Sequence, residues 1–169
     1  MWRIERIAEV SQDEALSAGD IDKDGRIDLL LGTRWLRNDM EEGWTVHSID
    51  PDRDKPDRNR LADINGDGRL DAVVGFEAIS VSGDVVWYEQ GTDPRIPWKR
   101  NLIGVVTGPM SLDVADFDSD GDLDVVVGEH NLENPAAARL VLFENVDGQG
   151  RNWRGAVQPG VGLRSPAGP

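Results

Sequence analysis

Short apolar runs separated by polar loops rich in aspartate and glycine recur along the chain, for example at Val85–Tyr88 and Leu140–Phe143. Runs of this length, rich in Val, Leu and Trp, are typical of β-strands. The 3.6-residue periodicity of an amphipathic helix is nearly absent. The pattern therefore predicts an all-β protein built from many short strands.

The chain also contains an internal repeat. Three segments align without gaps, beginning at Asp20, Asp63 and Asp116, and each reads Asp-x-Asp/Asn-x-Asp-Gly-x-x-Asp before an apolar strand that ends in glycine. A second landmark recurs with them, namely segments that begin with tryptophan, at Trp2, Trp44, Trp98 and Trp153. Each unit thus provides four short strands in roughly 40–50 residues, which is the size of a β-propeller blade. A β-solenoid or an open β-sandwich is the alternative, although solenoid turns are usually shorter.

We expect three four-stranded blades, at about residues 8–50, 51–104 and 105–157, and a disordered tail at residues 158–169. Residues 1–7 are expected to form the fourth strand of a split blade. Three blades are too few to close a ring, because propellers have about four to eight. A homodimer would supply six blades, with residues 1–7 of each copy packed at the third blade of its partner.

The spacing of the aspartates predicts a cation site in each loop. Ca²⁺ takes six to eight oxygen ligands at about 2.3–2.6 Å, and a tight loop brings the side chains at positions 1, 3 and 5 together. Glycine at position 6 allows the sharp turn, the backbone carbonyl of position 7 is available whatever its side chain, and the aspartate at position 9 closes the shell. An Asp-Gly turn without a metal is the alternative. Against it, the motif occurs three times in register, and crowded carboxylates repel one another without a cation.

Charge and composition exclude several classes of partner. The net charge is −14, with 32 acidic and 18 basic residues, so the surface repels nucleic acid and anionic membranes. No apolar run reaches the about 18 residues that suggest membrane insertion. Cysteine is absent, so no disulfide contributes to stability. The N-terminus has no apolar signal region, so we expect either a cytoplasmic protein or one whose leader has been removed.

Over about residues 1–157, the loops and the Val-Val-Gly strands that follow them resemble the FG-GAP/VCBS repeats of integrin α-subunits and of many bacterial and fungal extracellular proteins. The resemblance implies a β-propeller with about three Ca²⁺ per chain, and it favours an extracellular or periplasmic location. The implied metal residues, including the position 7 carbonyls, are Asp20, Asp22, Asp24, Arg26 and Asp28; Asp63, Asn65, Asp67, Arg69 and Asp71; and Asp116, Asp118, Asp120, Asp122 and Asp124. Loop two is expected to bind most weakly, because Asn65 replaces one carboxylate.

A second candidate site lies on the face opposite the calcium loops, where the connections vary in length and variable loops often bind ligands. The catalytic candidates there are Glu77, Glu129, His130, Arg58, Arg60 and Asp113, which would line a central channel. A solvated rim of Arg–carboxylate pairs is the simpler interpretation. His47 and the tryptophans are expected to be structural, with sugar stacking as the alternative for the tryptophans.

Two functions remain in competition because the repeat indicates a scaffold and not an activity. The favoured one is a calcium-stabilised module that binds a glycan or a protein through the face opposite the calcium loops. The alternative is a calcium-dependent hydrolase or lyase that acts on phosphate esters or polysaccharides in the central channel. A third reading is a gene fragment that folds but has no function. Whether the chain is an enzyme is not decided by its sequence.

Overall fold

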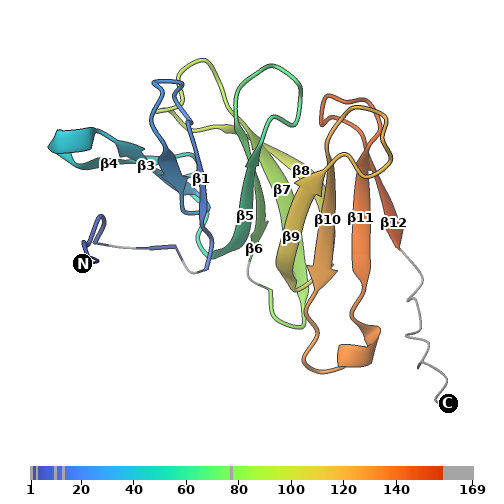
Figure 1. Ribbon diagram of the computed structural model, residues 1–169. Helices are drawn as coiled ribbons and strands as arrows, with labels where there is room; N and C mark the ends of the chain where they lie inside the picture. Colours follow the sequence, from blue (N-terminus) through green and yellow to red (C-terminus); the bar gives the residue numbers. More distant parts are fainter. Residues whose placement is uncertain (1, 3, 10, 13, 77, 158–169) are drawn as a thin grey trace, which may run out of the picture.

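The computed structural model describes residues 2, 4–9, 11–12, 14–76 and 78–157. These residues form three antiparallel four-stranded sheets that follow one another along the chain and stand side by side (Figure 1). Blade one contains β1 (Ser17–Gly19), β2 (Asp28–Leu30), β3 (Arg34–Asn38) and β4 (Trp44–Ser48). Blade two contains β5 (Pro56–Ala62), β6 (Asp71–Phe76), β7 (Ser82–Glu89) and β8 (Lys99–Thr107). Blade three contains β9 (Pro109–Ala115), β10 (Asp124–Glu129), β11 (Leu140–Asn145) and β12 (Trp153–Val157).

The predicted all-β fold of three four-stranded blades is therefore confirmed, with small differences at the boundaries. β8 continues to Thr107, past the expected end of blade two at residue 104. The described residues among 1–7 form no strand within this chain, so their place in a partner's blade stays a prediction. The tail at 158–169 lies outside the described residues. Two 3-10 helices, η1 (Met40–Glu42) and η2 (Pro135–Ala137), interrupt the loops, and no helix of the described part could span a membrane.

Blade two is the centre of the core because both faces of its sheet are buried. Successive side chains of a strand point to opposite faces. Accordingly, Val85 and Trp87 pack against blade three, while Val86 and Tyr88 pack against blade one. β6 is buried along its whole length, which explains its unbroken apolar sequence. Burying an apolar side chain of this size stabilises the fold by about 1.5–3 kcal/mol, so the two junctions are the main source of stability.

Side-chain amides at the ends of the third strands join each blade to the one before it. The side-chain amide nitrogen of Gln90, Nε2, donates to the main-chain oxygens of Ile21 in blade one and of Leu70 in its own blade, at 3.0 Å each. Asn145 repeats this arrangement one blade later, with Nδ2 at 3.2 Å from the oxygen of Ile64. Both amides are buried, so each satisfies carbonyls that solvent cannot reach.

Tryptophan side chains make a second link at the same junctions. Trp35 of blade one and Trp98 of blade two both donate their indole N–H to the main-chain oxygen of Pro94, at 3.2 and 2.9 Å. Trp35 is fully buried, and His47 stacks on it with the ring centroids 4.8 Å apart. His47 and Trp98 are therefore packing elements, as expected, whereas Trp2 of the same tryptophan series is fully exposed within this chain.

The first strands lie innermost, with β1 beside β5 and β5 beside β9. The β1–β2, β5–β6 and β9–β10 loops, which contain the aspartate motifs, gather at one end of the blades (Figure 1). The β6–β7 and β10–β11 connections lie at the other end (Figure 1). This arrangement places the candidate calcium loops and the candidates Glu129 and His130 at opposite ends, as the strand alternation predicted. Arg60 and Asp113 instead lie in the halves of β5 and β9 that lead into the aspartate loops.

Candidate metal loops and an adjoining cleft

The three aspartate loops share one internal geometry. In loop one, the carboxylate of Asp20 at position 1 accepts hydrogen bonds from the backbone N–H groups of Asp24 (3.0 Å) and Gly25 (2.9 Å). Asp63 accepts from the same two positions of loop two, at 3.0 and 2.7 Å. In loop three, Asp116 accepts from Gly121 at 3.2 Å. The position 1 carboxylate thus holds each loop in a closed turn.

The turn depends on glycine at position 6. Gly25, Gly68 and Gly121 have φ angles of 86°, 85° and 100°, a region that a side chain rarely adopts. The residue at position 3 supports the same turn, because Asp22, Asn65 and Asp118 each accept the backbone N–H of position 5. The sequence therefore folds these loops into a concave shape with oxygen atoms on its inner side.

The aspartate at position 9 has a role that its spacing did not reveal. Asp71 is fully buried, and its two oxygens accept the backbone N–H groups of Ile64 at 3.1 Å and Gln90 at 2.8 Å. Asp28 and Asp124 make the matching pairs of bonds in blades one and three. The residue therefore ties the loop to the end of the third strand. Burial raises the pKa of Asp71 to about 7, and Asp63 and Asp67 add to this rise.

Two of the loops bring carboxylate oxygens close enough together to hold a cation. One oxygen from each of Asp20, Asp22 and Asp28 lies within 4.8 Å of the others, and Asp116, Asp118 and Asp120 form a matching group. In loop three, Oδ1 of Asp122 is buried without a hydrogen-bond partner. Burial raises the pKa of Asp122 to about 6, together with the charges of Asp120 and Asp124. Groups of carboxylate oxygens whose negative charge is only partly neutralised fit a hard divalent cation.

The position 7 side chains differ between the loops. Arg26 and Arg69 each form an ion pair with the position 5 carboxylate of their own loop, Asp24 and Asp67. Loop three has Asp122 at this position instead. Loop three thus contains five aspartates, of which Asp116, Asp118 and Asp120 form the close group, and it lacks the position 7 arginine that partly neutralises the other two loops. Asp122 was expected only as a source of a backbone carbonyl, so its buried carboxylate adds to the predicted site.

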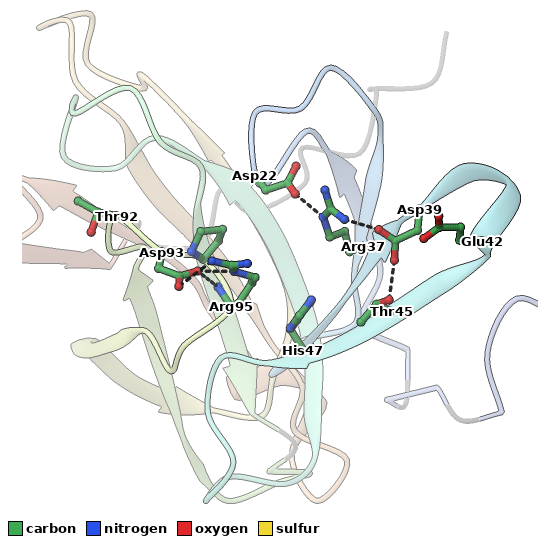
Figure 2. Close-up of a pocket in the computed structure, with 10 residues that line it drawn as sticks. Asp22, Arg37, Asp39, Glu42, Thr45, His47, Thr92, Asp93 and Arg95 are labelled. Atoms are coloured by element: carbon green, nitrogen blue, oxygen red, sulfur yellow. Dashed lines mark hydrogen bonds and ion pairs between the residues drawn. The ribbon is translucent and has the colours of Figure 1, made fainter.

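An open cleft of about 620 Å³ adjoins loop one on its outer side. Asp22 and Arg37 of blade one form one wall, Asp93 and Arg95 of the β7–β8 connection form the opposite wall, and His47 lies between them (Figure 2). Thr45 donates to Asp39, which also pairs with Arg37. Arg95 holds Asp93 through Nε at 2.8 Å and Nη2 at 3.1 Å. The cleft is polar, and sequence reasoning missed it because its two walls come from different blades.

The candidate residues of the predicted channel are distributed over separate ion pairs. Glu129 is held by Arg139, which also keeps the pKa of Glu129 at about 2, and its side chain is only 2% exposed. Arg60 pairs with Asp113 at 3.0 Å. These contacts correspond to the rim of Arg–carboxylate pairs that was the simpler interpretation. A carboxylate with so low a pKa is ionised at neutral pH and has no proton to give.

The other candidates do not join these pairs into one constellation. Arg58 binds Asp57 at 2.8 Å and Glu14 at 2.5 Å. The Nδ1 atom of His130 faces the sulfur of Met110. Glu77 lies outside the described residues. The structure therefore brings together Arg60 with Asp113, and it gives Arg58, Glu129 and His130 local partners of their own.

Comparison with known families identifies part of the repeat. Residues 63–127 match the model of the FG-GAP-like repeat family. The matched range begins at the first position of loop two and ends in β10, so it includes loops two and three, the strands β6 to β8 of blade two, and β9. The resemblance inferred from the aspartate motifs is confirmed over these residues. Comparison with curated proteins gave no match.

Proposed function

We propose that the chain is a calcium-stabilised β-propeller module whose loops bind about three Ca²⁺ ions. The observation that carries this proposal is the repetition of one loop geometry in three blades, with oxygen side chains at positions 1, 3, 5 and 9. The expected ligands are the residues of the three motifs together with the position 7 carbonyls. A calcium ion bound there would neutralise carboxylates that otherwise repel one another.

Such ions would act on stability, since a site that exists only in the folded chain adds its binding free energy to folding. Isothermal titration with Ca²⁺ tests this proposal, with about three ions expected per chain. The position 3 variants Asp22→Ala and Asp118→Ala should each remove about one ion, whereas Asp93→Ala, outside the loops, should remove none. Absence of calcium binding by the wild-type protein would refute the proposal.

We further propose that the module binds a glycan or a protein at the end opposite the calcium loops. Two observations favour binding over the hydrolase or lyase alternative. Glu129 and Arg58 are paired within the chain, with Arg139 and Asp57, and the low pKa of Glu129 does not suit a general acid. A glycan array probed in calcium, with Arg58→Ala as the variant expected to lose binding, tests this part.

We also propose that a second copy of the chain supplies the next blade. Position 2 of loops one and two is covered by the following blade, so Ile21 and Ile64 are 0% and 1% exposed, whereas Phe117 in loop three is 47% exposed. Asn38 holds the position in blade one that Gln90 and Asn145 hold in the later blades. In a dimer that continues the same packing, Asn38 of one copy would approach the main-chain oxygen of Phe117 in the other.

A further inference from the structure

The third strands of the blades present different charges to the loops beside them. Leu36, Tyr88 and Phe143 pair with the residues that follow Asp28, Asp71 and Asp124, which fixes the register of the three blades. The next residue in each third strand is Arg37 in blade one, Glu89 in blade two and Glu144 in blade three. Blade one therefore has a guanidinium where the other blades have carboxylates.

This guanidinium reaches into loop one. Nε of Arg37 donates to Oδ2 of Asp22 at 2.5 Å, and Nη2 donates to Oδ2 of Asp24 at 3.0 Å. Its third nitrogen, Nη1, pairs with Asp39 on the far side (Figure 2). The hydrogen bond to Asp22 raises the pKa of Arg37 above its ordinary value. Arg37 thus contacts the carboxylates at positions 3 and 5, both of which belong to the expected calcium ligands.

The matching residues of the other blades turn to other partners. Glu89 binds Arg151 of blade three at 2.7 Å and Lys99 at 3.1 Å. Glu144 binds Arg154 of its own blade. Loop three accordingly receives no guanidinium from its third strand. Among the described contacts, the third-strand side chain at this position contacts the aspartate loop of its own blade in blade one and not in blades two and three.

We propose that Arg37 is an internal counter-cation of loop one beside Arg26, and that a calcium ion entering this loop must displace Arg37 from Asp22 and Asp24. The inference rests on the proposed function, because it concerns the same loops. A carboxylate oxygen that faces a guanidinium at 2.5 Å must turn toward the metal before it can ligate it. Asp39 keeps the displaced guanidinium paired, so the exchange leaves no charge unpaired. Loop one then binds calcium more weakly than its four carboxylates predict.

Site-resolved calcium titration by NMR tests this role. The backbone amides of Gly25, Gly68 and Gly121 report on loops one, two and three, since each donates to the position 1 carboxylate of its own loop. In Arg37→Gln, we expect the calcium concentration at half-saturation to fall by about tenfold at Gly25, because calcium no longer competes with one charged hydrogen bond. The titrations at Gly68 and Gly121 should not change.

Arg95→Gln is the matched control, because Arg95 lines the same cleft and holds Asp93 without touching loop one. An unchanged midpoint at Gly25 in Arg37→Gln, or an equal shift in Arg95→Gln, would overturn the inference and leave the proposed function intact. If the wild-type amides show no response to calcium in any loop, the proposed function fails, and this inference fails with it.

Melting temperatures provide a second readout that does not depend on assigned amide signals. Arg37→Gln should lower the melting temperature more in a chelator than in saturating calcium, because the metal replaces the missing counter-cation. Arg37→Lys should lie between the wild type and Arg37→Gln, since it keeps the charge but loses the planar fork. Equal losses for Arg37→Gln in chelator and in calcium would assign Arg37 a packing role only and overturn the proposal.

Discussion

Trp87 of blade two and Trp153 of blade three donate their indole N–H groups to one main-chain oxygen, that of Gly150, at 2.9 and 3.0 Å. Trp35 and Trp98 share the oxygen of Pro94 in the same way one junction earlier. A single carbonyl thus fixes the third strand of one blade against the fourth strand of the next. This contact accounts for Trp98 and Trp153 among the recurring tryptophans, in addition to their apolar area.

Replacing Trp87 by phenylalanine should destabilise the protein by about 2–4 kcal/mol. The change removes a buried hydrogen bond and leaves a cavity in the junction, since Trp87 is fully buried. Urea denaturation measures the loss. Leu132→Ala is the control, because Leu132 is exposed and its replacement should change stability by less than about 0.5 kcal/mol. Similar losses in the two variants would contradict the role assigned to Trp87.

Gly104 tests the closeness of blades two and three. A Cβ atom at this position of β8 would overlap the ring of Phe143, whereas a Cβ at Gly91 would meet no atom within 4 Å. We expect Gly104→Ala to cost about 1–3 kcal/mol through overpacking, and Gly91→Ala to be neutral within about 0.5 kcal/mol. Thermal denaturation of the two variants decides, and equal stability would mean that the blades pack less tightly than described.

The ion pair of Glu129 with Arg139 makes a prediction about pH. Its pKa is lowered from 4.5 to about 2 in the folded protein, so the folded state favours the ionised carboxylate. This contribution is fully present above about pH 4.5 and is lost as the pH falls toward 2. Glu129→Gln should therefore cost about 1–2 kcal/mol at pH 7 and nothing near pH 2. Glu133→Gln, in the same connection and exposed, is the control whose cost should stay near zero at all pH values.

The proposed dimer can be tested at the exposed end of loop three. Multi-angle light scattering at micromolar concentration should give twice the chain mass for the wild type. Phe117→Asp should give the monomer, because it places a charge in the proposed contact. Leu132→Asp alters an exposed leucine in the β10–β11 connection, away from loop three, and should leave the dimer intact. A stable folded wild-type monomer would contradict the assembly.

The strands and loops could be predicted because they are encoded locally. The aspartate motif marks the first loop of each blade, and the tryptophans mark the fourth strand, which begins at Trp44 and Trp153 as expected and at Lys99 beside Trp98. Contacts between blades could not be predicted in this way. Arg37 has several carboxylates within reach of its long side chain, and its contact with Asp22 depends on how β3 lies against loop one. An alignment of the third strands would have revealed the charge reversal, but not the partner.

The candidate rim residues illustrate the same limit. The sequence placed Glu129 correctly at the end of the second strand, yet its partner Arg139 stands at the far side of a connection whose shape the sequence did not determine. The buried carboxylates at position 9 were expected as ligands, and their bonds to backbone N–H groups emerged only from the fold. Pairings that depend on loop conformation are thus the part that local patterns leave open.

The central claim, that calcium stabilises the blades, is tested most directly by thermal denaturation in excess calcium and in excess chelator. A free calcium concentration of about 100 times the dissociation constant stabilises the folded state by about 2.7 kcal/mol for each site. We therefore expect the melting temperature to be many degrees higher in calcium, and this difference to shrink in Asp120→Ala but not in the surface variant Asp93→Ala. Identical melting temperatures in calcium and in chelator, with removal of the metal verified, would contradict the account.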